Sequence, residues 1–273
     1  MTKTLARDVI DEQTIEEFRT SGVVIVRGLF SPAEVALVER GIERNLADPS
    51  PMFKVASRPD DPGKFVEDFC NWQRIEEFRR IAFESAAADV AATLMGGPEV
   101  RLFHDHMLVK EPGTRQDTPW HQDQPFYNVE GLDNCSMWMP VDPVAAESTL
   151  EFVAGSHRRG WLMPRSFMDC QARWFAEGTL QEIPDIESDR ADYDIRGWAM
   201  EPGDAVFFHM LTLHHAYGVP GNRRRRAFSL RFLGNDMVHA PRPWVCSPDF
   251  ASHDLDIPAG APMDDALFPV LRA

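Results

Sequence analysis

The sequence predicts a mainly β fold of the sandwich, jelly-roll or barrel type, with helices at its N-terminal side. Two observations support this class. Beyond about residue 100, short apolar runs alternate with Gly, Pro and Asn turns, and no helical spacing lies between them. Before that point helical spacing is common. The 273 residues suffice for one domain with a sizeable core.

The N-terminal part predicts a helix, a strand and a second helix. Residues 11–22 have helical spacing that ends at a Gly, and residues 23–29 form a β-branched run. The second helix begins with a capping box made by Ser31 and Glu34, with Pro32 at its first position. These signals fix where the first elements begin.

The rest of the chain predicts further helices and then strands. Residues 48–66 are rich in Pro and Asp and indicate irregular structure, whereas residues 72–96 predict one or two helices ended by Gly-Gly-Pro. The acidic stretch 182–195 indicates a long surface excursion, either an active-site lid or a solvated loop. Six segments predict strands: 100–111, 118–123, 136–142, 149–157, 203–216 and 224–234.

Composition excludes several partners. The 28 basic and 43 acidic residues give a net charge of −15, which argues against nucleic acid and anionic membranes and favours a small-molecule substrate. The chain contains no apolar run long enough to span a bilayer and no secretory h-region, so we expect a cytoplasmic protein. Its cysteines, Cys70, Cys135, Cys170 and Cys246, form no C-x-x-C pair and are expected to be free thiols.

A His-x-Asp pattern lies in "TPWHQDQPFY". On a strand, His121 and Asp123 project from the same side while Gln122 points away as a structural hydrogen-bonder. The later segment "GDAVFFHMLTLHHAYGVPGNRRRRAFSLRFLGND" adds a His near the end of an apolar strand. Two imidazoles and one carboxylate form the facial triad of non-haem Fe(II) oxygenases.

Four motifs in this order, "WHQDQPFY", "EFVAGSHRRG", "GDAVFFHMLTLHHAYGVPGN" and "RRRAFSLRFLG", resemble the phytanoyl-CoA dioxygenase family of Fe(II)- and 2-oxoglutarate-dependent oxygenases. The resemblance covers roughly residues 15–240. It implies a double-stranded β-helix, a cupin-like jelly-roll core with N-terminal helices packed on one sheet. We therefore expect one oxygenase domain over 1–273, with a helical buttress and first strand (1–98), a jelly-roll core (99–235) and a C-terminal strap (236–273).

The resemblance implies that His121, Asp123 and His214 bind Fe(II). His215 is the alternative to His214, but the family pattern places the ligand eleven residues before the Arg that binds 2-oxoglutarate, and His214 fits that spacing to Arg225. Related halogenases have Gly or Ala in place of the carboxylate, so Asp123 favours hydroxylation or another oxidation with O₂. Such a reaction attacks an unactivated C–H and releases succinate and CO₂.

The cosubstrate residues implied by the resemblance are Arg225 and Lys110, which hold the far carboxylate of 2-oxoglutarate, and Met107 and Trp138, which line its site. Strand alternation supports Arg225, because it places Ala227 on the same face and the large apolar residues on the other. A guanidinium can hold a carboxylate with two parallel hydrogen bonds. Arg223 and Arg224 are expected to be exposed turn charges.

Three residues are candidates for the substrate pocket. His106 shares the face of Lys110, although a core histidine is the simpler interpretation. Arg231 either pairs with a buried acid or contacts the substrate, and Trp244 lies on the C-terminal strap as a rim or purely structural residue. The acidic surface favours a small metabolite over an acyl-CoA. The sequence predicts no oligomeric state.

Two other functions stay open at this point. His104 and His106 resemble the His-x-His of a cupin metal site, which would give a metal enzyme independent of 2-oxoglutarate. A non-catalytic jelly-roll protein that binds a small molecule is the other alternative.

Overall fold

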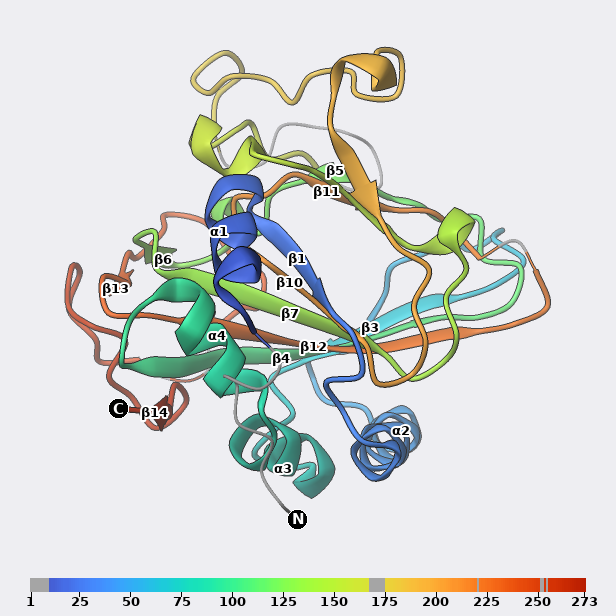
Figure 1. Cartoon of the computed structure of the whole chain (residues 1–273), viewed down its shortest axis with the longest axis horizontal. Coiled ribbons are helices and arrows are strands. Elements are labelled where there is room, and N and C mark those ends of the chain that lie inside the picture. Colours follow the sequence, from blue (N-terminus) through green and yellow to red (C-terminus); the bar gives the residue numbers. More distant parts are fainter. Residues whose placement is uncertain (1–9, 167–174, 220, 251–252, 254) are drawn as a thin grey trace.

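Two antiparallel sheets face each other across the centre of the molecule (Figure 1). The computed structural model describes residues 10–166, 175–219, 221–250, 253 and 255–273. The large sheet has the order β1 (Val23–Val26), β10 (Ala205–Phe208), β7 (Asn134–Pro140), β12 (Arg225–Leu233), β4 (Val100–Lys110), β3 (Phe65–Phe69), β2 (Lys54–Val55), with β14 (Val270–Arg272) also on β4. The smaller sheet has the order β5 (Thr118–His121), β11 (His214–Ala216), β8 (Leu150–Val153), β9 (Ile195–Gly197). This arrangement confirms the predicted jelly roll.

The helices lie on one side of the large sheet. In Figure 1, α2 (Pro32–Ala47), α3 (Glu76–Glu84) and α4 (Ala87–Met95) cover the face that points away from the smaller sheet. The rings of Phe78 on α3 and Phe228 on β12 stack at 4.3 Å between centroids. Helix α1 (Glu12–Ser21) packs beside β1 and ends at Gly22, whose φ of 74° is the left-handed conformation that glycine adopts without strain.

Short elements complete the fold. A two-stranded sheet pairs β6 (Val129–Glu130) with β13 (Val238–His239). Among the described residues, 3₁₀ helices span Gln124–Phe126, Ala146–Ser148, Ser156–Arg159 and Arg190–Asp192. No helix within the described ranges is both long and apolar enough to cross a bilayer. Cys70, Cys135 and Cys246 are free thiols, while Cys170 lies outside the described residues.

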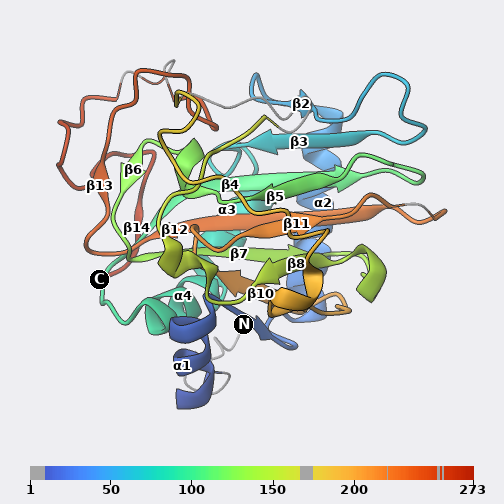
Figure 2. The same ribbon diagram turned by 90° about the horizontal axis from the view of Figure 1, so that it is seen from above.

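Alternation along β12 separates the core from the interior between the sheets. Phe228 and Phe232 are buried in the core beneath the helices, whereas Arg225, Ala227 and Arg231 project toward the smaller sheet. Figure 2 shows the smaller sheet lying over the long strands of the large one. The space between the sheets is therefore lined by the polar face of β12.

Two local predictions differ from the structure. The stretch 48–66, expected to be irregular, contains β2 and leads into β3 at Phe65. The segment 203–216, expected as one strand, forms β10 in the large sheet and β11 in the smaller one. The chain crosses between the sheets at Met210, whose carbonyl accepts hydrogen bonds from the backbone N–H of Asp123 (2.8 Å) and Gln124 (3.1 Å).

Candidate active site

His121, Asp123 and His214 meet at one end of the smaller sheet. His121 and His214 are direct partners in the β5–β11 register, and their ring centroids lie 4.1 Å apart. Asp123 follows β5, and its Oδ1 lies 3.6 Å from Nε2 of each histidine. All three side chains are buried, and their candidate ligand atoms lie within 4.8 Å of one another. The sequence placed these three residues together correctly.

Both histidines direct Nε2 toward Asp123. Nδ1 of His121 lies 2.8 Å from the carbonyl oxygen of Pro119, and Nδ1 of His214 lies 3.0 Å from that of Thr212. A carbonyl only accepts, so each Nδ1 carries the proton and each Nε2 presents a lone pair toward Asp123. Burial, and then the neighbouring His121, lowers the pKa of His214 to about 3, which keeps that imidazole neutral. This donor set fits a divalent metal ion.

Arg231 and Ser136 occupy the other side of the Asp123 carboxylate. Arg231 Nε lies 2.9 Å from Oδ2, and the Ser136 hydroxyl donates to the same oxygen at 3.3 Å. Burial opposes ionisation of Asp123, but the Arg231 cation outweighs it and holds the pKa of the carboxyl well below its usual range. The carboxylate is thus ionised and oriented with Oδ1 toward the histidines.

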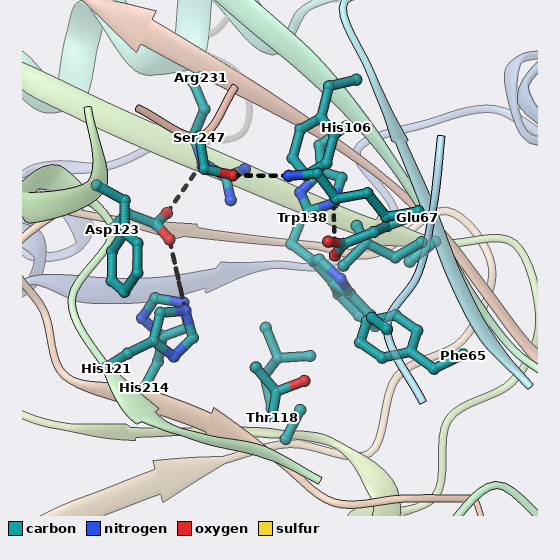
Figure 3. A pocket seen from close by; sticks show the side chains of 18 of the residues that line it. Phe65, Glu67, His106, Thr118, His121, Asp123, Trp138, His214, Arg231 and Ser247 are labelled. Carbon is teal, nitrogen blue, oxygen red and sulfur yellow. Dashed lines mark hydrogen bonds and ion pairs between the residues drawn. The ribbon is translucent and has the colours of Figure 1, made fainter. Parts of the chain in front are cut away.

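A cavity of about 460 Å³ opens in front of these residues. Figure 3 shows His121, Asp123 and His214 on one side, with Trp138, Glu67 and His106 across from them. The cavity lining includes Lys110 and Arg225 and also the segment Val245–Ser247. It can therefore hold a small cosubstrate and part of a second molecule.

Lys110 and Arg225 are register partners on β4 and β12. Lys110 Nζ donates to the backbone carbonyls of Gln116 (2.8 Å) and Tyr217 (3.0 Å). Arg225 donates to the carbonyls of Ser148 and, at 3.3 Å, Tyr217. Within the described part of the chain, neither cation forms an ion pair with a carboxylate.

Two adjacent buried cations without a counter-ion are costly. Burial, and then the neighbouring Arg225, holds the pKa of Lys110 well below its usual value, and burial lowers that of Arg225 to about 10. A dicarboxylate that reached these two cations would relieve the repulsion and gain charge-assisted hydrogen bonds.

The remaining predicted residues divide into two groups. His106, Trp138 and Arg231 line the cavity, and the Arg231 guanidinium is committed to Asp123. Met107 and Trp244 do not line it. Met107 is fully buried in the core because alternation along β4 turns it to the helix side, opposite Lys110, and Trp244 packs against Phe175 with ring centroids 4.7 Å apart.

The alternative ligands are placed elsewhere. His215 also lines the cavity, but it stacks on Trp120 with ring centroids 5.2 Å apart and groups with Glu151 and Glu187 instead of Asp123. His104 is buried against Phe103 and Tyr127 and belongs to no cluster of candidate metal ligands among the described residues. The cupin-type pairing of His104 with His106 therefore lacks the geometry of a shared metal.

The acidic segment 182–195 is tied to the smaller sheet. Arg190 forms an ion pair with Glu151 on β8 at 2.9 Å and with Glu187 at 3.1 Å. Glu187 also accepts a hydrogen bond from Trp120 Nε1 at 2.7 Å. Glu151, Glu187 and His215 lie close enough to suggest a second cation site, but Arg190 already supplies their positive charge.

Sequence reasoning missed the contribution of β3. Phe65, Glu67 and Phe69 alternate toward the cavity, and all three line it. The signal was the period-2 pattern of "FVEDF", which follows a Gly-Lys turn.

Comparison with protein families gives a match to the model described as phytanoyl-CoA dioxygenase over residues 18–227. A Caenorhabditis elegans protein named "Probable phytanoyl-CoA dioxygenase" is 27% identical over 198 residues, which cover 67% of this chain and 55% of that protein. An ectoine dioxygenase of Stutzerimonas stutzeri is 27% identical over 157 residues, which cover 55% of this chain and 51% of that one. The chain thus spans about half the length of these curated relatives.

Solved structures share the fold along nearly the whole chain. The non-haem α-ketoglutarate-dependent carbocyclase SnoK from nogalamycin biosynthesis superposes with a TM-score of 0.77 at 20% identity and covers 99% of both chains. The epimerase SnoN in complex with Fe³⁺, α-ketoglutarate and nogalamycin RO gives 0.75 at 22% identity, over 96% of this chain and 98% of that one. The family match includes His121, Asp123, His214 and Arg225, and the chain belongs to the phytanoyl-CoA dioxygenase family of Fe(II)- and 2-oxoglutarate-dependent oxygenases.

Proposed function

We propose that this chain oxidises an unactivated C–H bond of a small-molecule metabolite, with Fe(II), 2-oxoglutarate and O₂, and that hydroxylation is the reaction. The proposal rests on one observation: two groups of polar side chains line the same cavity. One is the triad of His121, Asp123 and His214, and the other is the pair of buried cations, Lys110 and Arg225. A metal ion and a dicarboxylate would satisfy both.

The residues would share the work as follows. The two Nε2 atoms and Asp123 Oδ1 would hold Fe(II), and Arg231 would keep Asp123 ionised and correctly turned. Lys110 and Arg225 would hold the far carboxylate of 2-oxoglutarate, with Trp138 beside it.

When bound, iron and 2-oxoglutarate would activate O₂ for oxidation of the C–H bond, with one oxygen atom passing to the substrate and the other to succinate as CO₂ is released. The protein's part is to hold the target carbon near the metal and to exclude water. Phe208 and Leu150 line the cavity and limit access of water. A single working domain over residues 1–273 and a cytoplasmic location belong to the same proposal.

Anaerobic titration of the metal-free protein with Fe(II) and then 2-oxoglutarate tests this function. We expect a weak metal-to-ligand charge-transfer band in the visible that is absent in His121→Ala and needs more 2-oxoglutarate in Arg225→Ala. Iron binding without any such band would reject the role of 2-oxoglutarate and revive a 2-oxoglutarate-independent metal enzyme or a simple binding protein. If the band appears as expected, succinate release serves to screen substrates.

A further inference from the structure

A second carboxylate faces the cavity, on the wall opposite the triad. Glu67 lies in the middle of β3, lines the cavity and has a side chain only 16% exposed. Its Oε2 lies 3.4 Å from Nε2 of His106. Figure 3 shows Glu67 and His106 together, across the cavity from His121 and Asp123. Glu67 therefore has no part in the triad.

The nearby lysine does not neutralise this carboxylate by contact. Lys54 is the register partner of Glu67 on β2. Its Nζ donates to Ser247 Oγ at 3.3 Å and lies 4.9 Å above the ring of Phe69. Among the described residues, His106 carries the one nitrogen within 4 Å of the Glu67 carboxylate, and burial lowers the pKa of this imidazole and so favours its neutral form.

His106 is fixed in a position that supports Glu67. Its ring stacks on Phe69 with centroids 4.0 Å apart and an interplanar angle of 19°. The stacked ring keeps Nε2 pointed at the carboxylate. Burial opposes ionisation of Glu67, but His106 and then Lys54 outweigh it and hold the pKa of that carboxyl below its usual value.

An ionised carboxylate can accept about four hydrogen bonds, and Glu67 uses little of this capacity within the protein. A group that enters the cavity as a donor would satisfy it, and a cationic donor would also compensate a charge held in low dielectric. The net charge of −15 favours approach of a cation over that of an anion.

The rim of the same wall is apolar. Val55 on β2 and Val245 in the C-terminal segment line the cavity and are 55% and 65% exposed. Exposed apolar side chains at a cavity mouth suit a hydrocarbon body. The cavity lining thus combines the Glu67 carboxylate with these apolar side chains and with Lys54, whose ammonium is directed to Ser247.

We propose that Glu67, positioned by His106, binds a protonated amine of the substrate, so that the substrate is an amine with an apolar body. The proposal rests on the function proposed above, because it places this amine in the cavity of the oxygenase site. Glu67 would set specificity and the orientation of the target carbon, and it would take no part in the oxidation.

Ligand-observed NMR with two probes of one shape tests the proposal. Cyclohexylmethylamine and cyclohexylmethanol differ in the amine alone, and the metal-free protein avoids any dependence on iron. We expect the amine to bind at least about tenfold more tightly than the alcohol, the value of one charge-assisted hydrogen bond. In Glu67→Gln this preference should disappear while the alcohol binds as before.

Two further variants act as controls. Glu16→Gln removes the same charge from the exposed face of α1 and should keep the preference, which separates a local contact from the field of the whole protein. Glu67→Asp keeps the charge and should retain part of the preference, and thermal unfolding checks that each variant is folded. Equal binding of both probes to the wild type, or an unchanged preference in Glu67→Gln, would overturn the proposal.

The charge-transfer band separates this inference from the function on which it rests. We expect Glu67→Gln to give the band of the wild-type protein, since Glu67 touches neither the triad nor Lys110. A missing band in the wild type would reject the oxygenase function, but the NMR experiment would still measure the preference for the amine over the alcohol. A normal band without amine preference would reject the role of Glu67 alone.

Discussion

Arg231 Nε lies 2.9 Å from Asp123 Oδ2, while Oδ1 of the same carboxylate faces both histidines. Both side chains are buried, with Arg231 on β12 and Asp123 just after β5. One oxygen of the carboxylate thus forms an ion pair with Arg231, while the other faces the candidate metal site. The prediction that Arg231 pairs with a buried acid follows from strand alternation, but the identity of that acid required the packing of β5 over β12.

Removing Arg231 should destabilise the metal-free protein strongly. Arg231→Met leaves Asp123 buried without its cation, which costs about 3–5 kcal/mol of unfolding free energy. Urea unfolding measures the change. The double variant with Asp123→Asn should recover part of the loss, because the uncompensated charge is gone. Equal stability of Arg231→Met and the wild type would show that the pair is not coupled.

Replacing the guanidinium of Arg225 by an ammonium group should weaken the binding of 2-oxoglutarate and leave the binding of iron unchanged. Arg225→Lys keeps the charge but loses the two parallel hydrogen bonds, so we expect roughly a 10–100-fold weaker affinity. Arg226→Lys is the matched control, because Arg226 points to the other side of β12 and pairs with Asp142 at 2.7 Å. Calorimetric titration of both variants with 2-oxoglutarate decides the matter, and similar losses in both would exclude a specific role for Arg225.

Much of this site follows from local patterns. A period of two placed His121 beside Asp123 and turned Arg225 and Ala227 inward, because alternation depends only on strand geometry. Such alternation needs no knowledge of the tertiary fold. The choice of His214 over His215 came instead from the spacing that the family resemblance implies, and in the structure His214 faces His121 while His215 stacks on Trp120.

Features set by long-range packing were missed. Glu67 enters the cavity because β3 adds to the edge of β4, and no local signal specifies that pairing. Trp244 was expected at the rim, but the neighbouring Val245 lines the cavity instead. The C-terminal segment has no long strand whose period could fix which side chain turns inward. Its orientation depends on contacts with distant loops.

Arg190 should control the order of the segment 182–195. Arg190→Ala breaks its ion pairs with Glu151 and Glu187, but these are partly exposed and contribute at most about 1 kcal/mol each. We therefore expect faster hydrogen exchange and proteolysis confined to this segment, with little change in Tm. Arg165→Ala, which removes an exposed pairing with Glu182, is a control at the margin of the segment. A global loss of stability in Arg190→Ala would contradict the assignment.

The low pKa of Lys110 predicts a pH dependence of opposite sign for binding and for stability. Burial, and then Arg225, lowers the pKa of Lys110 well below its usual value of 10.5. Only the protonated amine attracts the carboxylate of 2-oxoglutarate, so affinity should be full below the folded-state pKa and fall as the pH rises through it. Over the same range the unfolded chain binds more protons than the folded one, so the stability of the cosubstrate-free protein should rise with pH. Two measurements test these trends, the affinity for 2-oxoglutarate and the free energy of unfolding in urea. Both are made from neutral pH up to about 10, the lowered pKa of Arg225. Lys110→Met should abolish both, and a wild-type affinity that does not change with pH would show that Lys110 does not hold the cosubstrate as a cation.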